Sequence, residues 1–100
     1  MPLVVNAAEI LQIVGSDNVL IGDQNRDLSI KLYCLDVKKS DQEIASDLLK
    51  RNFPRGTKVK IMPYGFFQDK LIAKVYRLND HIEMSELLIS NNLASATCDD

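Results

Sequence analysis

Lysine and aromatic side chains gather in the middle of this 100-residue chain. Residues 31–74 carry ten Lys or Arg against five Asp or Glu, although the net charge of the whole chain is −2. Residues 63–70 hold three of the six aromatic residues. Because ammonium groups neutralise phosphates and aromatic rings stack on bases, this combination is typical of a surface that binds single-stranded nucleic acid. The candidate contacts are Lys31, Lys38, Lys39, Lys58, Lys60 and Lys70 for phosphates, and Tyr64, Phe66 and Phe67 for bases.

Other interpretations of these residues stay open. The same charges are found on ordinary solvated strand and helix faces, and Tyr64 and Phe66 would also suit a cap over one end of the core. The aromatic segment could instead hold a protein. The acidic balance of the whole chain favours a protein partner slightly over a nucleic acid.

The spacing of reactive residues reveals no catalytic constellation. His81 is the only histidine and stands beside Asp80 in a predicted turn, and the chain has no Gly-rich phosphate loop, CxxC pair or HExxH motif. The two cysteines do not amount to a disulfide framework. Cys34 is expected to be a small buried hydrophobe in a strand, and Cys98 to lie in a frayed tail. Metal ligation by this pair is not expected.

Length and composition indicate one soluble globular domain. It comprises residues 1–100, with a core at about 8–96 and with residues 1–6 and 97–100 frayed. No apolar run approaches the roughly 18 residues of a membrane span, and the N-terminus lacks the pattern of a signal peptide. We therefore expect a cytoplasmic protein with no membrane association.

Three short strands are predicted in the first third of the chain. Apolar residues mark them at 7–15, 19–21 and 28–36, and polar turns separate them at 16–18 and 22–27. Strands joined by such short turns form an antiparallel meander.

A helix is predicted at 40–51. Ser40 and Glu43 match a capping box at its start, and Phe53-Pro54 ends it, because the residue before proline is pushed out of helical geometry. Its apolar stripe is Ile44, Ala45, Leu48 and Leu49.

A hairpin and a second helix complete the predicted elements. The hairpin strands are 56–62 and 71–76, and the long loop 63–70 between them is of the kind that often carries function. The helix at 83–91 turns Met84, Leu87 and Leu88 inward, Asn91 or Asn92 suits its left-handed end, and residues 93–96 pack back on the barrel.

This order of elements predicts a mainly β fold with helices: a five-stranded OB-type barrel, β-β-β-α-β-β-α. Four segments, at 30–36, 56–61, 71–76 and 84–94, resemble the third, fourth and fifth strands and the following helix of the staphylococcal nuclease-like (thermonuclease) family. The resemblance covers roughly residues 8–96.

The resemblance implies a nuclease site from which this chain departs at most positions. Nucleases of the family use Ca²⁺, acidic ligands, a glutamate base and two arginines on the phosphate. Their first acid falls on Asn18, beside Asp17, and their arginines fall on Lys31 and Lys70. Asp36 is retained. The Thr-Pro-Glu that supplies the base is replaced by Val37-Lys38-Lys39.

These departures weaken catalysis, because lysine does not grip phosphate bidentately and because Asn18 with Asp36 offers little charge to Ca²⁺. We therefore expect a non-catalytic binding module with a degenerate active site and no metal or other cofactor. It would be a monomer or weak homo-oligomer that binds a protein or single-stranded DNA or RNA. The alternative is a divergent phosphodiesterase that uses Ca²⁺ with Asp36, Asp17, Lys31 and Lys70.

Overall fold

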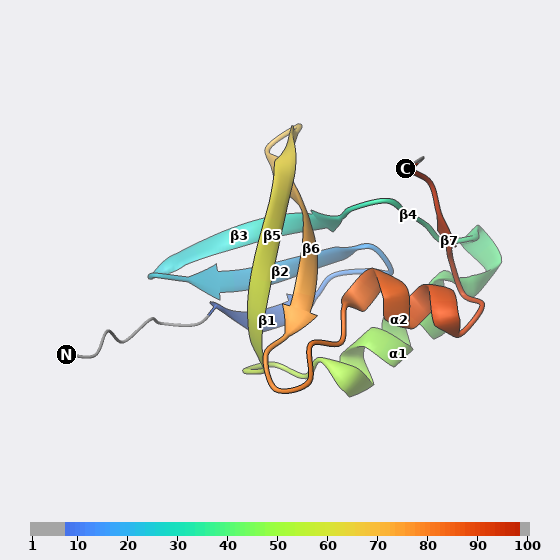
Figure 1. Ribbon diagram of the computed structural model, residues 1–100, viewed down its shortest axis with the longest axis horizontal. Coiled ribbons are helices and arrows are strands. Elements are labelled where there is room, and N and C mark those ends of the chain that lie inside the picture. Colours follow the sequence, from blue (N-terminus) through green and yellow to red (C-terminus); the bar gives the residue numbers. More distant parts are fainter. Residues whose placement is uncertain (1–7, 99–100) are drawn as a thin grey trace.

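Five strands close into a barrel in the order β1-β2-β3-β6-β5, and two helices lie at one end of it (Figure 1). The computed structural model describes residues 8–98. Neighbouring strands are antiparallel except β3 and β6, which run parallel. The predicted five-stranded OB-type barrel is thus confirmed. The strands are β1 (Ala8–Ile13), β2 (Asn18–Asp23), β3 (Arg26–Leu32), β5 (Lys58–Phe67) and β6 (Lys70–Arg77).

Alternation along the strands separates an inner face from an outer one. In β3, Ile30 and Leu32 are buried while Lys31 between them is only partly covered. In β6, Ala73 and Val75 are buried, so Ile72 and Lys74 belong to the outer face. The outer faces of β3 and β6 lie side by side, with Lys31 in register with Ile72.

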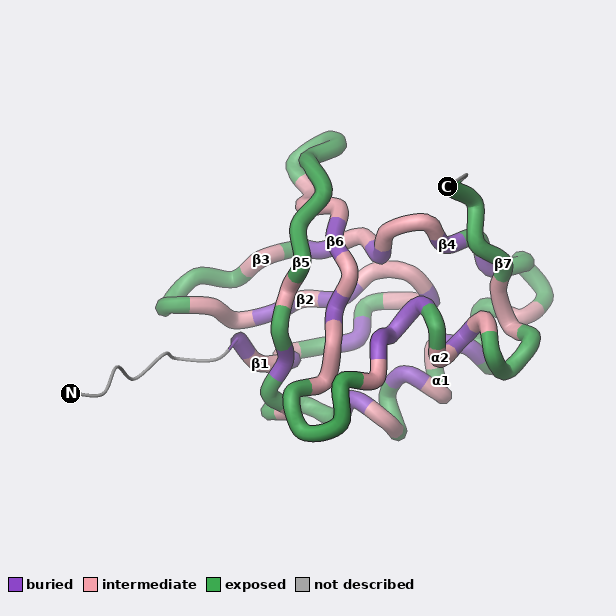
Figure 2. The backbone as a smooth tube through the Cα atoms, in the orientation of Figure 1, coloured by how far each residue is buried: buried purple, intermediate pink, exposed green. Residues whose placement is uncertain are grey.

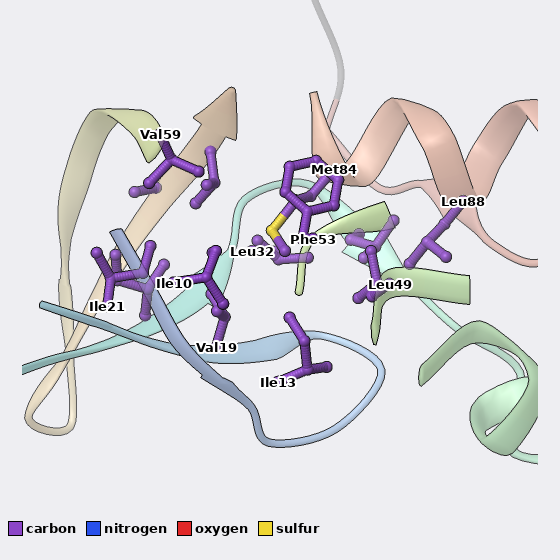
Figure 3. Close-up of a cluster of buried hydrophobic side chains, with 14 of the residues drawn as sticks. Ile10, Ile13, Val19, Ile21, Leu32, Leu49, Phe53, Val59, Met84 and Leu88 are labelled. Atoms are coloured by element: carbon purple, nitrogen blue, oxygen red, sulfur yellow. The ribbon is translucent and has the colours of Figure 1, made fainter. Parts of the chain in front are cut away.

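The two helices seal one end of the barrel with apolar side chains. They are α1 (Gln42–Asn52) and α2 (Met84–Ser90). Phe53 and Met84, together with Leu49 and Leu88, are fully buried next to the barrel interior (Figure 3). Burial of four such side chains stabilises the fold by several kcal/mol, at about 1.5–3 kcal/mol each.

The predicted start of the first helix is wrong. Ser40 lies inside a 3-10 turn, η1 (Lys39–Asp41), and α1 begins after Asp41 with no side-chain cap hydrogen bond. The backbone N–H of Asp41 bonds Lys38 O at 2.8 Å instead. Ile44 is also misplaced, with 56% of its surface exposed, because Ala45 and Leu49 form the centre of the buried face.

The predicted third strand is too long. β3 ends at Leu32, and Cys34 adopts a left-handed backbone with φ of 62°. β4 (Leu35–Asp36) then leaves the barrel and pairs with β7 (Ser95–Ala96) in a separate two-stranded sheet.

The expectations for both cysteines are wrong. Cys34 and Cys98 form a disulfide, and Thr97 N donates to Cys34 O at 3.1 Å. Residues 97–98 are therefore held in place rather than frayed. Residues 1–6 and 99–100, which were also expected to be frayed, lie outside the described part of the chain.

The predicted loop at 63–70 is mostly strand. β5 continues to Phe67, and only Gln68 and Asp69 form the turn, with φ of 49° and 63°. Two left-handed residues are what a type I′ hairpin turn requires. A register shift between Pro63 and Gly65 places a β-bulge at Tyr64.

The second helix agrees with its prediction. Met84 and Leu88 are buried, and Leu87 packs partly against the core. Asn92 takes the left-handed position, with φ of 61°, and Leu93 N bonds Leu88 O at 3.0 Å in the manner of a Schellman end. None of the helices within residues 8–98 is long and apolar enough to cross a membrane.

Candidate functional site

Four of the residues that the sequence analysis singled out meet beside the turn between β1 and β2. Lys31 Nζ lies 3.1 Å from Asp17 Oδ2, Asn18 Nδ2 donates to Asp17 Oδ1 at 2.7 Å, and Lys70 Nζ donates to Asn18 Oδ1 at 2.8 Å. We refer to Asp17, Asn18, Lys31 and Lys70 as the polar cluster.

The barrel itself assembles the polar cluster. Asn18 and Lys31 are cross-strand partners in β2 and β3, and Leu32 N fixes the turn by donating to Asp17 O at 2.9 Å. Lys70 begins β6, which runs parallel to β3. The position of each side chain therefore depends on strand pairing as well as on local sequence.

The two lysines of the polar cluster differ in their charge balance. Lys31 is paired with a carboxylate, and both partners are about one-third exposed, at 39% and 30%. Such a pair contributes under about 1 kcal/mol and is weakened by salt. Lys70 is bonded to a neutral amide, so its positive charge is not balanced within the cluster.

Asp36 lies outside the polar cluster because β4 leaves the barrel. It lies in β4, is exposed, and pairs with Ser95 of β7. Within residues 8–98, no three His, Cys, Asp or Glu side chains gather in a way that could hold a metal ion. The structure thus brings together Asp17, Lys31 and Lys70 of the predicted nuclease set, and leaves Asp36 outside.

An aromatic pair lies on the outer face of the neighbouring strands. The rings of Tyr33 and Tyr64 stack with centroids 3.8 Å apart and planes inclined by 2°. Lys74 Nζ lies 6.0 Å from the Tyr33 centroid and 5.9 Å from the Tyr64 centroid. We call Tyr33 and Tyr64 the tyrosine pair.

The tyrosine pair is held by backbone contacts on both sides. Tyr33 follows β3, and its N–H donates to Ala73 O of β6 at 3.0 Å. Tyr64 occupies the bulge of β5. Burial lowers the pKa of Lys74, but the neighbouring Tyr64, Tyr76 and Glu83 outweigh that effect and leave the pKa above its usual value. The site therefore keeps a cation beside the rings.

Sequence reasoning missed Tyr33 and Lys74. Tyr33 was counted within a predicted strand and given no role. The available signal was its spacing from Lys31, because residues two apart in a strand face the same side. Lys74 lies two residues after Ile72 in β6, so the two side chains face the same side. The closed barrel shows that this side is the outer one.

The end of the β5–β6 hairpin extends beyond the barrel and is exposed (Figure 2). Phe66 is 80% exposed and Phe67 58% exposed, and Tyr64 is exposed at 47%. The interpretation of Tyr64 and Phe66 as a cap over the core is therefore wrong. Phe67 is the cross-strand partner of Lys70, which links the hairpin end to the polar cluster.

Lys38 and Lys39 lie apart from these groups. Both are exposed and belong to the segment that follows β4, on the side of the helices and away from the hairpin end (Figure 1). Lys58 is also engaged elsewhere, because its Nζ is 2.7 Å from Glu9 Oε1 on β1.

Fold and site together define a small OB-type barrel with a polar cluster and a tyrosine pair on one outer face. No protein-family model and no curated protein sequence matches this chain. The thermonuclease-like resemblance therefore remains a hypothesis that depends on the segments quoted above and their order.

Proposed function

We propose that this chain is a non-catalytic OB-type module, a degenerate relative of the thermonuclease-like nucleases, that binds single-stranded nucleic acid. The observation that carries the proposal is the tyrosine pair with Lys74 beside it and the polar cluster on the same outer face. Aromatic rings and cations alternating on one face are what a strand of bases and phosphates requires.

The location on the barrel supports the same conclusion. OB-type barrels bind oligonucleotides across a strand face and through the loop after the first strand and the hairpin between the last two. Here Asn18, the first residue of β2 after the first turn, is bonded to Lys70, the first residue of β6 after the hairpin turn. The two loops thus meet beside the face that bears the tyrosine pair.

The lysines and the aromatic rings have different roles in the proposed binding. Lys70 and Lys74 supply charge for phosphates, whereas Lys31 contributes less because Asp17 pairs with it. Tyr64 and Phe67 are exposed enough to accept a base. Each stacked base contributes about 1–3 kcal/mol, so two such contacts supply measurable affinity at moderate salt.

Phosphodiester cleavage is the alternative, and the arrangement of the acids argues against it. The Asp17 carboxylate is already bonded to Lys31 and Asn18, and Lys39 stands where the resemblance would place the general base. Neither lysine of the polar cluster offers the bidentate contact with which arginine holds a phosphate.

Binding of a fluorescent single-stranded oligonucleotide, DNA and RNA, at several salt concentrations tests the proposal. Log affinity should fall linearly with log salt, and Lys70→Ala should reduce the slope by about 0.7 for one lost phosphate contact. Lys38→Ala is the matched control, since it removes the same charge far from the site. No binding at low salt, or equal loss in both variants, would contradict the proposal and leave a protein as the partner.

A further inference from the structure

A disulfide ties the C-terminal segment to the turn that carries Tyr33. Cys34 and Cys98 are 64 residues apart in sequence, yet their Cα atoms are 5.1 Å apart. Tyr33 immediately precedes Cys34 and stacks on Tyr64. One covalent bond therefore lies a single residue away from the tyrosine pair.

The backbone of Cys34 is in a conformation that residues other than glycine seldom adopt. Its φ is 62°, in the left-handed region that is disfavoured by contact of Cβ with the backbone. Thr97 N donates to Cys34 O at 3.1 Å, while Tyr33 N is bonded to Ala73 O. The turn is thus held by β6 on one side and by the C-terminal segment on the other.

Apart from the disulfide, little holds residues 95–98. β7 has two residues, both exposed, that pair with Leu35 and Asp36 of β4. A pairing this short is marginal in water without further support. Because Leu93 and Ala94 pack partly against the core, loss of the disulfide would free the segment only beyond them.

The disulfide is open to attack from solvent. Cys98 is exposed, whereas Cys34 is half-buried. Thiol–disulfide exchange depends on access to the sulfur that is attacked, so Cys98 Sγ is the entry point. In a reducing compartment, protein disulfides are usually transient or redox-sensing.

We propose that Cys34–Cys98 is a redox switch that controls the order of the Tyr33 turn. A thiolate of a dithiol reductant attacks Cys98 Sγ, the S–S bond breaks, and Cys34 leaves as a thiolate that takes up a proton. The second thiol of the reductant then displaces Cys98 from the mixed disulfide. Two electrons pass to the protein, which gains two thiols, and the reductant becomes a disulfide.

Reduction removes one of the restraints on the turn that carries Tyr33. Residues 95–98 separate from β4, and Cys34 is free to leave its left-handed conformation. Tyr33 keeps its bond to Ala73 O, but its ring is held less firmly against Tyr64. The loss of order in the turn follows from these contacts alone. The resulting loss of nucleic-acid affinity additionally rests on the proposed function.

Amide hydrogen exchange of the full chain, air-oxidised and then reduced with dithiothreitol, tests the switch. Exchange at residues 35–36 and 95–97 should become about tenfold or more faster on reduction, while the buried strand residues Ile21 and Val75 stay protected, since local opening is independent of global unfolding. Cys98→Ser should behave as the reduced protein with or without dithiothreitol. Equal exchange in the oxidised and reduced forms would overturn the proposal.

Two further readouts separate this proposal from the proposed function. The chain contains no Trp, so its near-ultraviolet circular dichroism reports chiefly on tyrosines and on the disulfide itself. The tyrosine bands of this signal should weaken on reduction, beyond the loss of the disulfide's own broad contribution. Oligonucleotide affinity should fall about fivefold or more, as expected from partial loss of one stacking contact. If the oxidised protein binds no oligonucleotide, the proposed function fails, while exchange and dichroism still decide the switch.

Discussion

The ring of Tyr64 lies flat against that of Tyr33, with 3.8 Å between the centroids. Tyr33 follows β3 and Tyr64 lies in β5, two strands that are not neighbours because β6 lies between them. The contact therefore spans three strands of the barrel. Lys74 of β6 lies about equally far from both rings, at 6.0 and 5.9 Å.

Removing the Tyr64 ring should weaken oligonucleotide binding. Tyr64→Ala is expected to lower affinity about five- to tenfold or more, since one stacking contact contributes about 1–3 kcal/mol, and to reduce the near-ultraviolet dichroism. Titration with the labelled oligonucleotide measures this. Tyr64→Phe keeps the stack and serves as the control. Wild-type affinity in Tyr64→Ala would show that the tyrosine pair is not the binding surface.

Calcium should make no difference to nucleic-acid integrity. We expect single-stranded DNA and RNA to stay intact with Ca²⁺ and with a chelator alike, because Asp17 is engaged by Lys31 and Asp36 lies in β4. Gel analysis after prolonged incubation gives the answer. Metal-dependent cleavage that disappears in Asp36→Ala would establish the phosphodiesterase alternative.

The N-termini of the two helices should respond differently to mutation. The Glu83 carboxylate caps α2 by accepting from Ser85 N at 2.8 Å and Glu86 N at 3.1 Å. Glu83→Ala should therefore cost about 1 kcal/mol or more. Ser40 makes no cap contact at α1, so Ser40→Ala should stay within about 0.5 kcal/mol. Urea denaturation compares the two, and a clear loss in Ser40→Ala would argue for the capping box after all.

Lowering the pH should weaken the ion pair between Arg77 and Asp80 on the surface. A hydrogen bond from Arg77 lowers the pKa of Asp80 below its usual value, since it favours the charged carboxylate. A carboxyl group whose pKa is lower in the folded state stabilises the protein fully at pH values above its pKa in the unfolded chain, about 3.9. This stabilisation is lost as the pH falls through the lower pKa of the folded state. Asp80→Asn should thus flatten the fall in unfolding free energy below about pH 4.

Glu9→Gln is the companion variant for that experiment. A side-chain hydrogen bond from Lys58 lowers the pKa of Glu9 in the same way. Glu9→Gln should therefore also flatten the fall in unfolding free energy at acid pH. Chemical denaturation at a series of pH values measures both variants. An acid response unchanged from wild type in Asp80→Asn would contradict the role given to the Arg77–Asp80 pair.

Local patterns were sufficient to predict the barrel and its order. Alternation at Ile30 and Leu32 reveals a strand with one buried face, because successive side chains point to opposite sides. Phe53-Pro54 marks a helix end because proline restricts the residue before it. The family resemblance predicted a site of Asp36, Asp17, Lys31 and Lys70. Strand pairing brings the last three together, whereas Asp36 lies apart in β4.

Local sequence patterns did not predict the geometry of the turns. Gln68 and Asp69 lack the Asn-Gly or Asp-Gly signature of a tight hairpin turn, yet both take positive φ because the pairing of β5 and β6 continues up to them. Likewise, the 3-10 turn at Lys39–Asp41 displaced Ser40 from the helix start. In both places, the neighbouring elements determine the backbone conformation.

The stacking of the tyrosine pair and the disulfide were not predicted from the sequence, and only the tertiary structure reveals them. Closing the barrel brings Tyr33 to Tyr64, and the return of the C-terminal segment along β4 brings Cys98 to Cys34. The same departure of β4 from the barrel carries Lys38 and Lys39 away from Lys31. The sequence thus determined which faces are apolar and in what order the elements follow, because these depend on neighbouring residues. The tertiary structure decided which outer side chains share a surface, because that depends on how the chain closes on itself.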